Sequence, residues 1–108
     1  MNNDLIFTYR RNTDVAHVDV AKPSENAEVE VREMGDLVGF PGQVLVRFDA
    51  QTGELYGMTF QRWSSMRRTL MWRHRTFVAR KVRDELVAKI VDFFSENNRH
   101  HRQPALIH

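Results

Sequence analysis

The chain has 108 residues, of which 42% are hydrophobic and 28% are charged, as expected for one globular domain. It contains no cysteine, which excludes a disulfide framework and a thiolate zinc site. No stretch approaches the ~20 apolar residues of a membrane span, and the N-terminus lacks a signal-peptide pattern, so we expect a cytoplasmic protein with no membrane contact.

The net charge of +2 hides an uneven distribution of charged residues. Residues 1–54 carry ten acids and five Lys/Arg, whereas residues 55–108 carry four acids and eleven Lys/Arg. From Leu55 to Arg83 there are eight Lys/Arg and no acid. Such a basic segment is typical of polyanion binding, but it also fits attraction between the two halves, within one chain or between two.

The first half of the chain predicts β-structure. Alternating or β-rich patterns occupy residues 5–11, 15–20, 27–34, 43–49 and 54–61. In the third segment Val29 and Val31 oppose Glu30 and Arg32, which predicts a half-buried strand. Residues 35–42 contain three glycines and predict a loop, and Gly53 supplies the positive φ of a hairpin turn. We therefore expect about five strands in a mostly antiparallel meander.

The second half changes to a helical period. Residues 77–96 predict a long amphipathic helix. Its apolar stripe consists of Val78, Ala79, Val82, Leu86, Ile90, Phe93 and Phe94. Asn97 and Asn98 are stop residues, and the aperiodic segment after them contains Pro104. The predicted fold is α+β, with an antiparallel sheet of about five strands and one long C-terminal helix packed on one face. We expect a single domain over residues 1–97 and a flexible tail over residues 98–108.

Residues 62–76 fit two kinds of structure. As a helix, Trp63, Met66 and Leu70 share a face with His74 and Phe77, and Ser64 is placed to cap it. As a strand, Leu70, Trp72 and His74 alternate with Met71 and Arg73. We favour a short helix or an irregular link that leads into the long helix.

The same segment holds the candidate binding residues. They are Arg62, Trp63, Arg67, Arg68, Trp72, Arg73, His74 and Arg75. Arginine pairs with carboxylate or phosphate and stacks on aromatic rings, so this set predicts a basic, aromatic binding surface. We favour a non-enzymatic interaction module that binds a protein partner; binding of nucleic acid through the same residues is the alternative. Aromatic side chains left uncovered by the helix would also suit a homodimer.

No catalytic or cofactor site is predicted. His17 and Asp19 share a strand face, as a general base and its partner would, but no nucleophile motif accompanies them. The glycines of residues 35–42 lack the lysine and the following helix of a phosphate-binding loop. We therefore expect no enzyme activity, no metal and no cofactor.

Two motifs resemble a known family. In residues 7–20 a tyrosine is followed five residues later by an aspartate and an alternating strand, and residues 44–64 combine an apolar strand, an acidic turn ending in glycine and a second strand containing glycine. Over roughly residues 5–65 these motifs are similar to a small bacterial domain-of-unknown-function group, catalogued as twenty-two eighty-three. The matching positions are Tyr9, Asp14, Asp49, Gly53 and Gly57.

The chain also departs from the pattern of that group. Arg10 stands where an acidic residue is usual, and His17 replaces an aromatic residue. The resemblance implies a small antiparallel sheet. It implies no activity, and because some members are thought to sit beside toxin-like partners, it favours a binding role.

Overall fold

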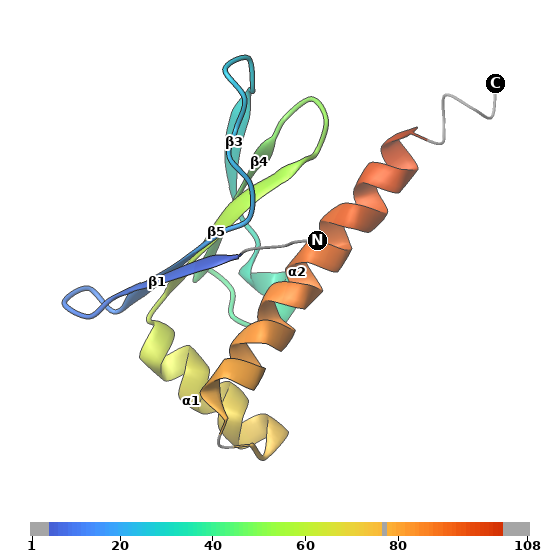
Figure 1. Cartoon of the computed structure of the whole chain (residues 1–108). Coiled ribbons are helices and arrows are strands. Elements are labelled where there is room, and N and C mark those ends of the chain that lie inside the picture. Colours follow the sequence, from blue (N-terminus) through green and yellow to red (C-terminus); the bar gives the residue numbers. More distant parts are fainter. Residues whose placement is uncertain (1–4, 77, 103–108) are drawn as a thin grey trace.

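The computed structural model describes residues 5–76 and 78–102, with only the backbone for Ala79 and residues 97–102 (Figure 1). The strands are β1 (Ile6–Arg10), β2 (Val15–Asp19), β3 (Val29–Glu33), β4 (Val44–Asp49) and β5 (Leu55–Gln61), and the helices are the 3₁₀ turn η1 (Gly35–Val38), α1 (Trp63–His74) and α2 (Ala79–Arg102). Within these described residues the fold is α+β, with a five-stranded antiparallel sheet and two α-helices, which confirms the predicted class and the predicted number of about five strands.

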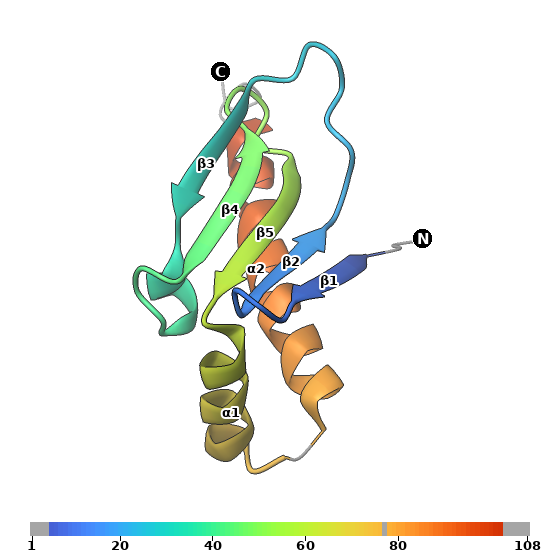
Figure 2. The ribbon, with the colours of Figure 1, turned by 90° about the vertical axis from the view of Figure 1, so that its left-hand side faces the viewer.

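The order of the strands differs from the predicted meander. It is β1-β2-β5-β4-β3, so β2 pairs with β5 and not with β3. The connection between β2 and β3 runs around one end of the sheet to reach its far edge (Figure 2). The central strand is β5, in which all residues from Leu55 to Phe60 are buried. The most apolar hairpin, β4–β5, thus lies inside the sheet, and the more polar β1 and β3 form the edges.

One hydrophobic cluster joins the sheet to both helices. Its members from the sheet include Ala16, Val18, Val44, Val46, Met58 and Phe60, and its members from the helices are Trp63, Met66, Leu70, Val82, Leu86, Val87, Ile90 and Phe94. The strand residues recur with period two and the helical ones at spacings of three and four, so each element contributes one apolar side. Phe48 of β4 and Phe94 of α2 meet with ring centroids 5.3 Å apart.

Several local predictions need correction. All five residues of β3 are exposed, not half-buried, because β3 is an edge strand. Residues 35–38 form the 3₁₀ turn η1 within the predicted loop. In α2, the predicted apolar stripe is buried at its centre, but Val78 before the helix and Phe93 within it are exposed.

The long helix also extends further than predicted. It begins at Ala79 and continues through the expected stop at Asn97 and Asn98 to Arg102. Asparagine only weakly disfavours helix, so it does not by itself end one. The division into a domain over residues 1–97 and a flexible tail stays a prediction, and residues 103–108 lie outside the described part of the chain.

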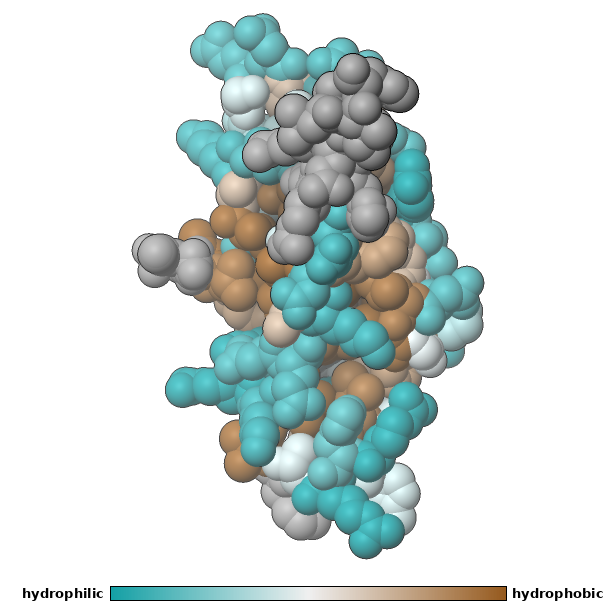
Figure 3. Space-filling view, turned by 90° about the vertical axis from the view of Figure 1, so that its right-hand side faces the viewer, coloured by the Kyte–Doolittle hydropathy of each residue, from teal (hydrophilic) through white to brown (hydrophobic). Residues whose placement is uncertain are grey.

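The exposed side of α2 is polar. In Figure 3 hydrophilic side chains run along the helix, and hydrophobic ones gather on both sides of them. Within residues 5–76 and 78–102, neither helix combines the length and apolar character needed to cross a bilayer.

Candidate interaction surface on helix α1

The start of α1 is held by a residue from another part of the chain. Asp14, in the β1–β2 turn, accepts hydrogen bonds from the backbone N–H of Ser64 (3.0 Å) and from Ser64 Oγ (2.7 Å). Its carbonyl also accepts from the N–H of Trp63 at 3.0 Å. Ser64 was predicted to cap the helix; instead Asp14 fills that role, because a carboxylate can accept both Ser64 bonds at once.

Tyr9 completes this arrangement. Its hydroxyl donates to Asp14 Oδ1 at 2.6 Å. The hydrogen bonds from Tyr9 and Ser64 lower the pKa of Asp14, and the same contact with the Asp14 carboxylate raises the pKa of Tyr9. The β1–β2 turn and the first turn of α1 are therefore joined through one ionised side chain.

Residues with positive φ flank α1 at both ends. Arg62 precedes it and Arg75 follows it, both with φ of 54°. This left-handed conformation costs a non-glycine residue about 1 kcal/mol. At the C-terminal end it lets the N–H of Arg75 bond to the carbonyl of Trp72 at 3.2 Å, which closes the helix.

The two tryptophans lie on opposite sides of α1. Trp63 is only 5% exposed and packs with Phe7 and Phe60, whereas Trp72 is 85% exposed. Trp63 therefore cannot stack on a partner, and including it in the predicted surface was wrong. Nine residues of helix rotate the chain by two and a half turns, which accounts for the opposite placement.

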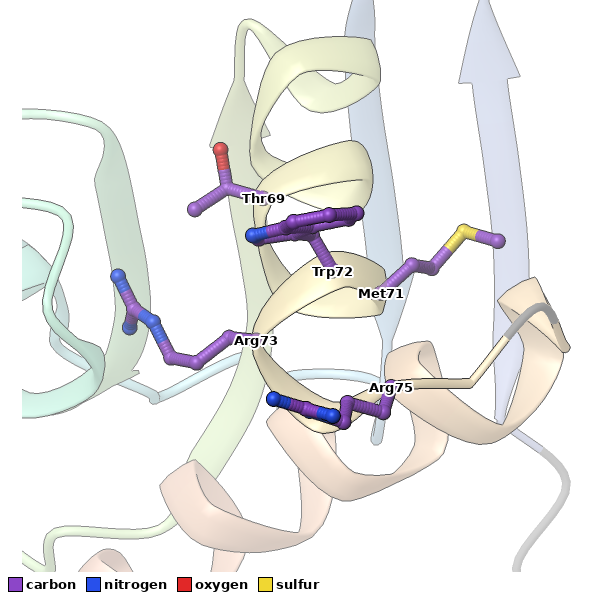
Figure 4. A pocket seen from close by; sticks show the side chains of 5 residues that line it. All are labelled: Thr69, Met71, Trp72, Arg73 and Arg75. Carbon is purple, nitrogen blue, oxygen red and sulfur yellow. The ribbon is translucent and has the colours of Figure 1, made fainter.

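Trp72 is surrounded by polar and basic residues. Arg68 lies four residues before it and so next to it on the helix surface, and Arg75 follows just past the end of the helix. Figure 4 shows Trp72 projecting from α1 between Thr69 and Arg75, with Arg73 and Met71 extending to opposite sides. These five side chains line a surface hollow of about 660 Å³. We call Arg68, Thr69, Trp72, Arg73 and Arg75 the Trp72 surface.

Of the remaining predicted residues, Arg67 and His74 contact neighbouring elements, and Arg62 lies apart from Trp72. Arg67 is half-buried beside the β1–β2 turn, where its charge helps to lower the pKa of Asp14. His74 Nδ1 lies 3.8 Å from Glu85 Oε1 of α2, an ion pair only when the imidazole is protonated. Arg62 is exposed at the opposite end of α1 from Trp72. Of the eight predicted residues, the structure thus brings together Arg68, Trp72, Arg73 and Arg75.

The electrostatics of the Trp72 surface are one-sided. Helix α1 contains no acidic residue. The Arg73 guanidinium lies 5.8 Å from the centroid of the Phe40 ring, a cation–π contact. Arginines beside an exposed indole can bind carboxylates or phosphates while the ring covers an apolar or aromatic group. Thr69 was not among the predicted residues, because its exposed position becomes clear only once the segment is known to be a helix.

His17 and Asp19 each contact a residue of another strand. His17 Nδ1 lies 3.0 Å from Thr59 Oγ1, and Asp19 Oδ1 accepts from Arg47 Nη2 at 3.3 Å. Arg47 Nη1 also donates to Thr59 Oγ1 at 3.0 Å. These bonds tie β2, β5 and β4 together across the sheet. Among the described residues, no group of three potential ligands is placed to hold a metal ion.

The turn between β4 and β5 is organised by Asp49. Its Oδ1 accepts from the N–H groups of Gln51 (2.8 Å) and Thr52 (3.1 Å), and these bonds lower the pKa of Asp49. The hydroxyl of Tyr56 donates to Oδ2 at 3.1 Å. Gly53 has the predicted positive φ, 77°. The acidic residues of the two motifs therefore stabilise turns.

Comparisons with protein-family models, curated proteins and solved structures found no match for this chain.

Proposed function

We propose that the protein is a non-enzymatic interaction module that presents the Trp72 surface to an acidic protein partner. The observation that carries this proposal is the 85% exposure of Trp72 between Arg68 and Arg75. Tryptophan and arginine are the side chains that most often dominate the energy of binding interfaces. An indole exposed to this degree contributes nothing to the core, whereas covering it with a partner removes a large apolar area from water.

The charge pattern supports an acidic partner. The Trp72 surface contributes three guanidinium groups and no carboxylate, so it favours a segment rich in Asp or Glu and repels a basic one. We also propose that the protein is cytoplasmic and that it is related to the bacterial domain-of-unknown-function group that residues 5–65 resemble.

The experiment compares partners recovered with the wild-type chain, Trp72→Ala and a Lys22→Ala control from nuclease-treated native extract. Lys22 is an exposed cation in the connection between β2 and β3, away from α1. A specific partner should be lost with Trp72→Ala, retained with Lys22→Ala, and bound again by purified wild-type protein. Recovery of the same proteins with all three chains would reject the proposed surface.

A second candidate function is binding of single-stranded nucleic acid. The specific observation in its favour is that arginines flank an exposed indole, because charge and stacking together are what such binding uses. A short single-stranded oligonucleotide should then bind more weakly as salt rises. Arg68→Ala should reduce the salt slope by about one phosphate contact. Absence of binding at low salt would eliminate this candidate.

The proposal also includes the finer architecture, in which α2 packs along one face of the sheet. The Phe48–Phe94 contact supports it, as does Figure 2, where α2 lies behind the sheet. In this arrangement α2 holds the sheet from behind while α1 projects beyond it.

A further inference from the structure

Within residues 5–76 and 78–102, the strand β3 has an unpaired outer edge. In this part of the chain it is the last strand of the sheet and pairs with β4 alone. In Figure 2 no other element of the described chain lies along its outer side. Val29 and Val31 of this strand are 46% and 55% exposed. An edge with unpaired backbone groups and exposed β-branched residues is a template for another strand.

The hydrogen bonds at the two ends of β3 show which backbone groups point outward. The N–H of Ala50 donates to the carbonyl of Glu28, and the N–H of Met34 donates to the carbonyl of Val44, both at 2.8 Å. The backbone N–H and C=O groups of the even-numbered residues of β3 therefore point toward β4. Because backbone direction alternates along a strand, the N–H and C=O groups of Val29, Val31 and Glu33 point away from the sheet.

The side chains of β3 are self-complementary about Val31. If two copies of the strand run antiparallel with Val31 opposite Val31, Glu30 of each copy lies opposite Arg32 of the other, and Val29 lies opposite Glu33. Glu30 and Arg32 already form an ion pair within the strand at 3.4 Å. The four side chains then alternate in sign around a square, with each charge next to two opposite ones.

The backbone geometry agrees with this register. Val31 would exchange both hydrogen bonds with its counterpart, and Val29 would do so with Glu33 of the second copy, which uses the outward-pointing groups. Glu30 and Arg32 then fall at the non-hydrogen-bonded positions, where opposing Cα atoms approach to about 4.5 Å and side chains interact most closely. A register shifted by one residue would use the groups already bonded to β4.

We propose that a second copy of this chain docks on β3, forming a two-fold dimer with one continuous sheet. A two-fold axis requires that one surface match itself, and β3 meets this condition in both charge and backbone direction. The other edge strand, β1, has no such match, because Arg10 is its one charged residue. The dimer is independent of the proposed function, since β3 and α1 are separate elements of the fold.

Charge reversal tests the register directly. In Glu30→Arg the facing positions all carry arginine, and in Arg32→Glu they all carry glutamate, so each variant alone should dimerise on the order of tenfold more weakly. Mixing the two variants places arginine opposite glutamate at every pair and should restore dimers that contain one chain of each. Sedimentation from low to high micromolar concentration measures all three samples.

Two further variants separate docking from folding. Val31→Pro removes an N–H that points outward, so it should abolish the dimer while the β3–β4 pairing remains. Arg68→Glu makes the same charge change as Arg32→Glu but on α1, and it should leave the dimer intact. Circular dichroism confirms the fold of each variant.

The possible outcomes are distinct. Monomeric wild-type protein at every concentration overturns the proposal, as does a mixture of the reversed variants that stays monomeric. A dimer that survives Val31→Pro but is lost with Arg68→Glu places the contact on α1 and also overturns it. Loss of the dimer in each charge-reversed variant with recovery on mixing establishes the β3 register. None of these results depends on whether the Trp72 surface binds its partner.

Discussion

Single carboxylates hold two turns of this protein in place. Asp14 links the β1–β2 turn to α1, and Asp49 closes the β4–β5 turn. Both have a lowered pKa in the folded chain, so each favours the ionised form there. Their contribution to stability is present above the unfolded pKa of about 4 and is lost as the pH falls through the folded value.

Asp14→Asn tests this contribution. Asparagine tolerates the positive φ of 57° at this position but cannot ionise. The variant should be less stable at neutral pH, and its free energy of unfolding should fall less steeply on acidification because one carboxylate with a lowered pKa has been removed. Urea unfolding across the acidic range measures the slope. A slope equal to that of the wild type would mean that the Tyr9 and Ser64 contacts do not hold the carboxylate.

Tyr9→Phe provides the matched alkaline test. The raised pKa of Tyr9 means that its contribution to stability is present below its unfolded pKa of about 10 and is lost as the pH rises through the folded value. The phenylalanine variant should therefore lose less stability on going to alkaline pH, although Tyr56, whose pKa is also raised, still contributes.

At Gly57 the surrounding atoms leave no room for a side chain. A Cβ atom there would lie 2.7 Å from the carbonyl oxygen of Val18 and would collide with the guanidinium of Arg47. Arg47 lies across this glycine to reach Thr59 and Asp19. Gly57→Ala should destabilise the fold by about 1–3 kcal/mol.

A double variant separates the two contacts of Gly57. Arg47→Ala removes the guanidinium but leaves the backbone of β2 in place, so adding it should recover only part of the loss caused by Gly57→Ala. Thermal and urea unfolding of the two single variants and the double variant measure the difference. Full recovery would mean that the Val18 carbonyl moves away freely.

At the scale of elements, the sequence predicted what depends on local pattern. The strands, the β4–β5 hairpin and the central part of α2 follow from periods of two and 3.6 and from Gly53. The order of the strands does not, because pairing β2 with β5 depends on which apolar strand best fills the centre of the sheet. The exposure of β3 likewise depends on its place at the edge.

The helix determines which residues of the predicted candidate surface lie on the same side. Grouping Trp63 with Trp72 was consistent with an undecided segment, but a helix from Trp63 to His74 places them on opposite sides. The capping of α1 by Asp14 could not be predicted, because it joins residues 50 positions apart. Basic composition therefore predicts a candidate surface, and three-dimensional packing determines which of its residues lie together.

The buried stripe of α2 gives the prediction that belongs to this scale. Leu86 is 5% exposed, Ile90 is fully buried, and both belong to the cluster shared with the sheet. Leu86→Ala or Ile90→Ala should lower the free energy of unfolding by about 2–5 kcal/mol, through lost burial and the cavity left behind. Ala88, one face away and exposed, offers a control position, where Ala88→Ser should cost less than about 1 kcal/mol. Small losses at both buried sites would contradict the assigned packing.

At the scale of the whole molecule, the two proposed contacts lie on different elements. The connections between β2 and β3 and between β4 and β5 lie at the end away from α1 (Figures 1 and 2). These connections carry acidic residues, whereas α1 is purely basic. Because β3 and α1 are separate elements, a dimer formed through β3 would leave both copies of the Trp72 surface open. One assembly could then bind two acidic partners.

Tryptophan fluorescence tests this separation. Acrylamide, a neutral quencher that the arginines neither attract nor repel, should reach Trp72 and not the buried Trp63. Trp72→Phe should therefore remove most of the quenchable emission and leave a shielded signal. In the wild type, the quenchable fraction should stay the same as the concentration passes through the monomer–dimer range, because docking on β3 leaves Trp72 exposed. If quenching falls as dimers form, the second copy covers α1, and the partner and the second copy would compete for one surface.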